Sequence, residues 1–194
     1  MRLLLAMLLL TGLSREAALA QQSGANSPAP YIADDEIAMT FNKLSQRALR
    51  MIPMLEQLRP NDWVAKGAPD AYTTQWNSVI QQFRAIETDM TALAQHPGKL
   101  TDTMKALFRL DATHPVLESL LGGTRKYQNP ALADLIESVV SENTSDVDRV
   151  ERYLLQLAAD QEQQFAVVDR EAQRCRATLS RQPAEPARNN RKSQ

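Results

Sequence analysis

Residues 37–58 have the sequence IAMTFNKLSQRALRMIPMLEQL, in which apolar side chains recur at alternating steps of four and three residues. Residues 72–93, YTTQWNSVIQQFRAIETDMTAL, repeat the same steps. A mean step of 3.5 residues is typical of the seam between two helices that pack as a left-handed coiled coil. Both stretches are therefore predicted to be long amphipathic helices. Their apolar stripes consist of Ile37, Phe41, Leu44, Ala48, Met51, Leu55 and Leu58, and of Tyr72, Trp76, Val79, Phe83, Ile86, Met90 and Leu93.

A third apolar stripe follows residues 147–179, with a mean step close to the 3.6 residues of an α-helical turn. One polar residue, Gln161, interrupts it. This stretch is also predicted to be a long helix, and its stripe is expected to be buried in the same core. The residues of this stripe are Val147, Val150, Leu154, Leu157, Gln161, Phe165, Val168, Ala172, Cys175 and Leu179.

Proline and glycine fall almost only between these stretches, where they predict helix ends. Pro53 lies inside the first helix and is expected to kink it. Pro115 is expected to break the third interval into a helix over 101–112 and a shorter piece that ends at residue 121. Residues 59–70 are predicted to be a loop, long for a connection in a helical bundle. The breaks lie at residues 60–69, 97–98 and 122–130, and beyond residue 183.

Two helix starts carry capping signals. Asn129 followed by Pro130 predicts the N-cap and first residue of a short helix that extends to about residue 142. Ser145, with Asp148 three residues later, has the spacing of a capping box and predicts the start of the final helix.

The fold class follows from these stripes and from the composition of the 194-residue chain. No segment alternates apolar and polar residues over a run of β-branched side chains, and aromatic residues make up only 5% of the chain. The prediction is an all-α fold, an elongated antiparallel bundle of three long helices plus shorter ones, with coiled-coil-like packing. Residues 34–181 are expected to form this single domain.

The N-terminus has the pattern of an export signal. Arg2 supplies a positive charge, residues 3–13 are almost entirely apolar, and residues 18–20 (ALA) offer the small side chains that a signal peptidase recognises. Residues 1–20 are therefore expected to be cleaved, and residues 21–33 to be a flexible lead-in. The mature chain is expected to be soluble, without a transmembrane segment, and periplasmic or extracellular. The short signal and the lack of a disulfide framework favour a bacterial source.

The formal net charge of −1 conceals two segregated regions. Residues 21–169 hold 13 basic and 20 acidic residues (−7), whereas residues 170–194 hold 7 basic and 2 acidic residues (+5). No nucleic-acid partner is expected, because the chain as a whole is not basic. Residues 182–194 are predicted to be a disordered basic tail, which either contacts an anionic cell envelope weakly or is solvated without a partner. The cations of this tail are Arg188, Arg191 and Lys192.

Cofactor chemistry has few candidate residues in this chain. Asp111, His114 and Glu118 would share one face of an unbroken helix, but Pro115 lies between them, and the second histidine, His96, is expected at a helix end. The motifs for covalent haem and for a di-iron bundle are absent. We therefore predict neither a metal site nor a cofactor. The alternative is a bundle that holds a metal or haem through a histidine or a methionine.

Two further residues are candidates for contacts with other molecules. Trp63 lies in the predicted loop among polar residues, where it either contacts a partner or folds back onto the end of the bundle. Cys175 is the single cysteine and lies on the third stripe, which predicts a buried small apolar residue. In an oxidising compartment it is also a candidate for an intermolecular disulfide.

The motifs of common nucleophilic and metal-dependent hydrolases, G-x-S-x-G, S-x-x-K and H-E-x-x-H, are absent. We therefore expect an exported, non-enzymatic binding, scaffold or chaperone-like module. Its partner is expected to be another protein or a second copy of the chain, because a stripe with a 3.5-residue step serves internal packing and self-association equally well.

Overall fold

The computed structural model describes residues 31–181. The predicted signal, most of the lead-in, and the basic tail with Arg188, Arg191 and Lys192 lie outside this range. The chain divides into two units, Met1–Tyr31 and Ile32–Gln194, and the described helices belong to the second. They are α1 (Asp34–Leu55), α2 (Pro60–Ala65), α3 (Ala71–Gln95), α4 (Leu100–Tyr127), α5 (Pro130–Ser141) and α6 (Thr144–Arg181).

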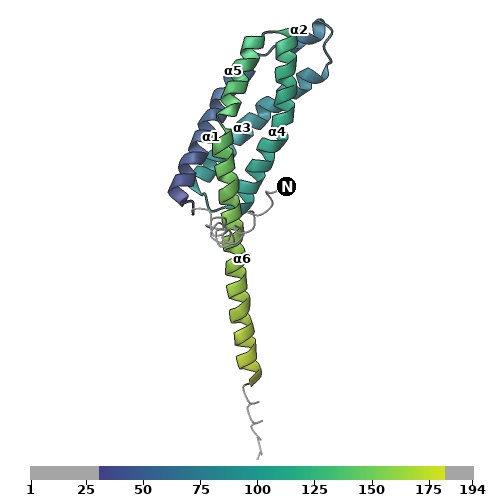
Figure 1. Ribbon diagram of the computed structural model, residues 1–194. Coiled ribbons are helices and arrows are strands. Elements are labelled where there is room, and N and C mark those ends of the chain that lie inside the picture. Colours follow the sequence, from purple (N-terminus) through teal and green to yellow (C-terminus); the bar gives the residue numbers. More distant parts are fainter. Residues whose placement is uncertain (1–30, 182–194) are drawn as a thin grey trace, which may run out of the picture. The chain divides into compact units, whose positions relative to one another are not determined.

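These helices form an up-and-down bundle. Helix α1 packs against α3, α3 packs against α4, and α4 packs against both α5 and α6. Helices α5 and α6 follow one another along the fourth side and also contact α1, which closes the bundle (Figure 1). The described part of the chain contains no strand, so the all-α prediction is confirmed.

About half of the core comes from the two stripes predicted over residues 37–58 and 72–93. All seven residues of the first stripe are buried, and so are five of the second. The remaining two, Tyr72 and Trp76, are partly buried and pack against the same core. Because burial of a large apolar side chain contributes about 1.5–3 kcal/mol, these stripes account for much of the favourable free energy of folding.

The prediction that Pro115 breaks the third interval is wrong, because α4 continues through it for 28 residues. Pro115 is exposed, whereas Thr113 and Leu117 on either side of it are buried. Packing of these neighbours holds the helix together although Pro115 cannot donate a backbone hydrogen bond. The described residues therefore hold four helices longer than 20 residues, namely α1, α3, α4 and α6, rather than three.

Helix α2 and the end of α4 close one end of the bundle, where a loop was expected. Trp63 is fully buried in α2, and its ring meets that of Tyr72 edge to face with centroids 5.6 Å apart. The Trp63 indole N–H donates to Oε1 of Gln128 over 3.1 Å, and the same oxygen accepts from the backbone N–H of Arg59 over 2.9 Å. Trp63 is therefore a core residue that fixes this end of the bundle, so of the two alternatives given for it the structure has the one that folds back onto the bundle, and the contact with a partner is corrected.

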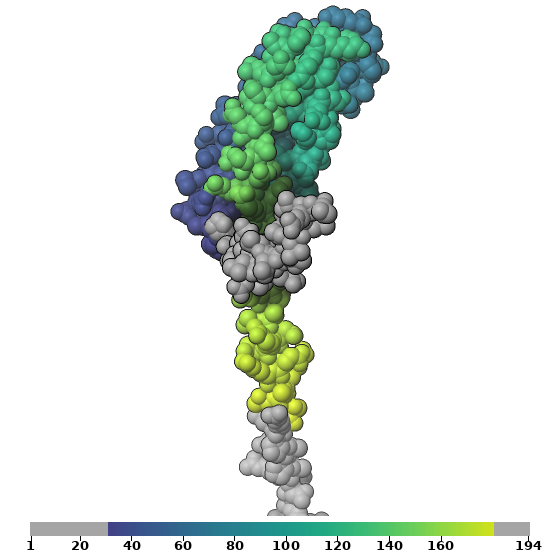
Figure 2. Space-filling view, viewed as in Figure 1, coloured from purple at the N-terminus to yellow at the C-terminus, as the bar shows by residue number. Residues whose placement is uncertain are grey.

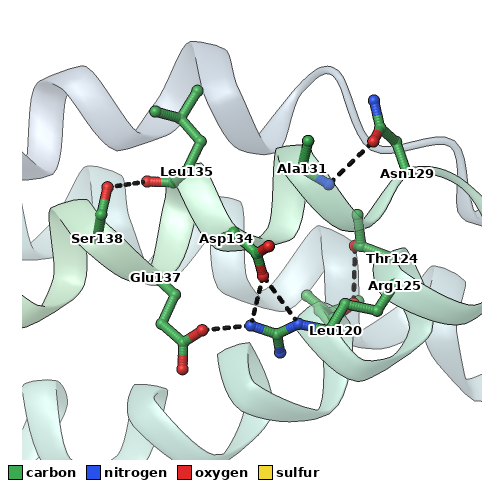
Figure 3. A network of polar contacts seen from close by, with 9 residues as sticks. All are labelled: Leu120, Thr124, Arg125, Asn129, Ala131, Asp134, Leu135, Glu137 and Ser138. Carbon is green, nitrogen blue, oxygen red and sulfur yellow. Dashed lines mark hydrogen bonds and ion pairs between the residues drawn. The ribbon is translucent and has the colours of Figure 1, made fainter.

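The junction between α4 and α5 carries a polar network (Figure 3). Arg125 near the end of α4 donates to Asp134 over 3.1 Å and 3.2 Å and also to Glu137, both on α5. The hydrogen bond to Asp134, with a smaller contribution from Glu137, raises the pKa of the Arg125 guanidinium above its ordinary value. The Asn129 side chain accepts from the N–H of Ala131 over 3.0 Å, which confirms the predicted cap of α5.

The start of α6 differs from the predicted capping box. Asn143 occupies the capping position, since its backbone carbonyl accepts from the N–H groups of Asp146 and Val147. Ser145 consequently lies inside the first turn of α6 rather than before it. The box spacing matched by coincidence, because a serine or threonine caps a helix only from the residue that precedes the first turn.

Candidate functional site

Half of α6 lies outside the bundle. From residue 161 to residue 180 every side chain is exposed except Ala172, which is half-buried. We call residues 161–181 the α6 extension. In Figures 1 and 2 it continues, coloured yellow-green, beyond the body formed by the other helices. At 1.5 Å per residue these residues add about 30 Å of helix.

The extension carries the second half of the third stripe, which was expected to be buried. Phe165 is 71% exposed, Val168 65% and Leu179 62%. Cys175 is exposed as well, so its prediction as a buried residue is wrong. Steps of three and four residues put these side chains on one face of the helix, together with Ala172. The expected burial fails because no other helix of the described residues reaches this part of α6.

Polar contacts fix the root of the extension to the N-terminal end of α1. Tyr153 donates its hydroxyl hydrogen to Asp34 over 2.9 Å, and Arg149 pairs with Glu36. The Gln156 side chain accepts from the backbone N–H of Ile32 over 2.9 Å and donates to the backbone carbonyl of Ile32 over 3.0 Å. The extension therefore leaves the bundle from a root held by specific contacts.

The turn before α6 is tied to α1 by a partly buried ion pair. Arg47 on α1 pairs with Asp146 in the first turn of α6, and its Nε lies 4.0 Å from a carboxylate oxygen of Glu142. Asp146 is only 9% exposed, so this charge is removed from most of the surrounding water. Loss of one partner would leave the other charge uncompensated, which makes this contact a structural anchor of α6.

A pocket of about 210 Å³ lies where α3, α4 and the start of α6 meet. Asp111, His114 and Asp148 are among its polar lining residues. Asn143 also lines it, and its Oδ1 atom is buried without a hydrogen-bond partner in the part of the chain that the structure describes. The pocket can hold a small apolar molecule. Its apolar wall consists of Phe83, Ile86, Leu110, Leu117, Val140 and Val147.

The carboxylates and histidine singled out in the sequence do not assemble into a metal site. His114 Nε2 lies 3.3 Å from Glu118 Oε1, with both side chains more than half exposed. Within residues 31–181 no group of three His, Cys, Asp or Glu side chains could hold a metal ion. His96 is the C-cap residue of α3, whereas His114 lies within α4.

A second, polar pocket of about 270 Å³ lies between the end of α3 and the start of α4, and it is lined by His96. Its cations are already paired. Arg109 donates to Asp89 over 2.9 Å, and Lys105 lies 3.7 Å from Asp102. These internal pairs leave little uncompensated charge to attract an ion.

Comparison of the chain with protein-family models, with curated proteins and with solved structures finds no match. The fold defines the class of the protein, an all-α helical bundle. No described helix is both long enough and apolar enough to cross a membrane.

The sequence contains one signal for the exposed half of α6. The stripe takes two consecutive steps of four residues, from Leu157 to Gln161 and on to Phe165, within the polar run DQEQQ at residues 160–164. That run marks the point where the stripe leaves the core. The pocket had no comparable signal, because its wall is assembled from residues of α3, α4, α5 and α6 that only the packing of these helices brings together.

Proposed function

We propose that this chain is an exported, non-enzymatic binding module whose docking element is the α6 extension. The observation that carries the proposal is the exposed apolar face of that helix, with Phe165, Val168 and Leu179 each more than 60% exposed. Export rests on the pattern of residues 1–20, and a native protein that retains Met1 in mass spectrometry would contradict it.

These side chains are exposed on a helix that gains no stability from tertiary contacts. Isolated helices are marginal in water, and most helical stability in proteins comes from packing of an apolar face. Contiguous exposed apolar surface marks sites of interaction. Binding along the extension would supply the packing that the bundle does not provide, and it would convert a marginal helix into an ordered interface.

The test uses photocrosslinking in intact cells of the source organism. Phe165 is replaced by p-benzoylphenylalanine, and the matched control carries the same residue at Phe108, an exposed aromatic residue on α4. We expect a defined protein adduct from position 165 and none from position 108. An absence of adducts at position 165, or the same adducts from both positions, would overturn the proposal.

A second candidate function, the binding of a small apolar molecule, is favoured by the pocket beside Asn143. An apolar cavity of about 150 Å³ is known to take up benzene, so a pocket of about 210 Å³ suits a bicyclic ring. A ligand of this kind would bury its ring against Phe83 and Leu117. The Oδ1 atom of Asn143 is buried, so the side chain would have to turn this atom toward the pocket to accept a hydrogen bond from the ligand's donor.

Indole and indene test this candidate, because the two molecules have similar shapes and only indole carries an N–H donor. We expect indole to raise the melting temperature more than indene does, and the Asn143→Ala substitution to remove the difference. Equal shifts from both molecules, or no shift from either, would exclude a site of this chemistry.

A further inference from the structure

We infer that the α6 extension binds the α6 extension of a second copy of this chain, with the two helices antiparallel. This inference rests on the proposed function and names the partner of the same surface. Two observations support it. The first is the order of side-chain sizes along the stripe, and the second is the distribution of charge along the helix.

The order of sizes suits a two-fold axis that passes near Arg170. From Gln161 to Leu179 the stripe steps by four, three, four, three and four residues, so it is symmetric about residue 170. In the antiparallel pair, Phe165 faces Cys175 of the second copy and Val168 faces Ala172 of the second copy. In these two layers each large side chain meets a smaller one, which keeps their volumes similar, and in the outer layer Leu179 faces Gln161 of the second copy.

A parallel pair would stack each residue on its own copy. Phe165 would face Phe165 and Ala172 would face Ala172, so a crowded layer would lie two steps from an underfilled one. Underfilled layers leave cavities, and crowded layers force side chains from their preferred rotamers. Packing therefore favours the antiparallel arrangement.

Charge points in the same direction. Residues 161–169 hold two carboxylates and no basic residue, whereas residues 170–181 hold four arginines and one glutamate. Antiparallel helices lay the acidic part of one copy along the basic part of the other. Parallel helices would align the four arginines with one another, which costs free energy between neighbouring like charges.

One specific contact follows from this register. Glu162 and Arg176 are exposed and flank the stripe on the same side, each one residue after a stripe position. In the antiparallel pair, Glu162 comes beside Arg176 of the second copy, and the two-fold axis repeats the contact. In a parallel pair, Arg176 would instead lie near Glu171, so an exchange of charge between positions 162 and 176 distinguishes the two arrangements.

The centre of the interface limits its affinity. Asp169 lies near Asp169 of the second copy across the two-fold axis, and this contact is unfavourable. Glu171 lies near the axis too, but its carboxylate is already paired with Arg174 at 2.7 Å in the same helix. The association is therefore reversible and dependent on concentration.

The register also determines whether Cys175 can form a disulfide with Cys175 of the second copy. The two Cys175 residues are offset by ten residues along the pair, which is about 15 Å at the helical rise. A disulfide needs Cα atoms within about 7 Å, so the antiparallel pair does not join Cys175 to its own copy. The predicted intermolecular disulfide therefore belongs to a parallel pair.

Sedimentation of the full mature chain over a concentration series tests the association. We expect a monomer–dimer equilibrium that Phe165→Glu abolishes and that Phe108→Glu, on an exposed aromatic residue of the bundle, leaves unchanged. Glu162→Arg and Arg176→Glu are each expected to weaken association by about tenfold, because each turns two attractive contacts into repulsive ones. The double exchange E162R/R176E should restore it.

Distances between spin labels test the direction of the helices. Gln163, Arg170 and Ala177 lie seven residues apart on the face opposite the stripe, and each is changed to cysteine in a Cys175→Ser background. The antiparallel pair gives the shortest distance at position 170. Positions 163 and 177 gain an axial separation of about 21 Å from an offset of 14 residues. Equal distances at the three positions would overturn the antiparallel arrangement.

The outcomes separate this inference from the proposed function. A chain that stays monomeric at every concentration, while position 165 still crosslinks to a different protein in cells, overturns the second copy as partner and leaves the binding module standing. A monomeric chain with no adduct at position 165 overturns both.

Discussion

At the residue scale, Gly123 in α4 has little space for a side chain. A Cβ atom built on Gly123 would lie 2.9 Å from Cε1 of Tyr72 and 3.0 Å from Cζ3 of Trp63. Both rings are held by neighbours, Tyr72 by Tyr127 and Trp63 by its hydrogen bond to Gln128. Glycine at this position therefore lets the helix approach the aromatic cluster at the end of the bundle.

We predict that Gly123→Ala destabilises the fold by about 1–3 kcal/mol, because the rings have to move to admit the methyl group. The adjacent Gly122 is exposed and has no atom within 4 Å of its Cβ position, so it provides a matched control. Gly122→Ala should stabilise the helix by about 0.5–1 kcal/mol through its higher helix propensity. Urea unfolding of the two variants measures both effects, and equal changes would contradict the packing argument.

Trp63 shows what sequence alone can decide about a single residue. Its neighbours Asn61, Asp62 and Lys66 are compatible both with an exposed loop and with packing against the end of the bundle. The contact that buries the indole comes from Gln128, 65 positions away. Local polarity carries no information about such a contact, because the helix pairing that creates it depends on the whole bundle.

At the scale of the helices, α4 shows that packing can overrule a proline. Pro115 removes the hydrogen bond that residue 115 would donate to the carbonyl of Asp111, yet α4 runs unbroken from Leu100 to Tyr127. Pro130, in contrast, stands in the first turn of α5, where the missing N–H would have no helical partner in any case. The two prolines are both exposed and differ chiefly in their position within a helix.

We predict that Pro115→Ala raises the free energy of unfolding by about 1–3 kcal/mol, since it restores one backbone hydrogen bond without opening a cavity. Pro130→Ala should instead lower it by up to about 1 kcal/mol, because the chain loses a residue preorganised for the first turn. Thermal unfolding followed by circular dichroism compares the two. A loss of stability in the Pro115 variant would show that α4 depends on the bend that proline imposes.

In α6 the periodicity of apolar residues predicts the helix but not which part of it is buried. Its stripe was correctly predicted to be helical, and Val150 at its beginning is buried as expected. The same spacing continues to Leu179, which is 62% exposed. An apolar stripe predicts that one face of a helix is covered, but the covering surface can belong to the same chain or to another molecule.

At the scale of the whole molecule, the sequence was sufficient for the fold class and for the two stripes that form about half of the core. These features are local, because each depends on residues a few positions apart on one helix. The pocket beside Asn143 and the closed end around Trp63 depend on helix pairing, which only the structure provides. For α6, the polar run at residues 160–164 marks where the stripe leaves the core, but only the structure shows that no other described helix covers the second half.

The bundle should therefore fold without the α6 extension. We predict that a chain ending at Asp160 unfolds cooperatively in dilute solution, with a free energy of unfolding within about 0.5 kcal/mol of that of the full chain, because the deleted described residues are almost all exposed. Loss of the cooperative transition would show that the extension is part of the folding unit.

Concentration then separates folding of the bundle from association of the extensions. A partner that binds only the folded state adds stability that grows with its concentration. Urea unfolding of the full chain should move to higher urea as protein concentration rises, whereas the chain ending at Asp160 and the full-length Phe165→Glu variant should unfold at the same urea concentration throughout. If the truncated chain shows the same dependence as the full chain, the bundle itself associates, and the apolar face of α6 is not the surface responsible.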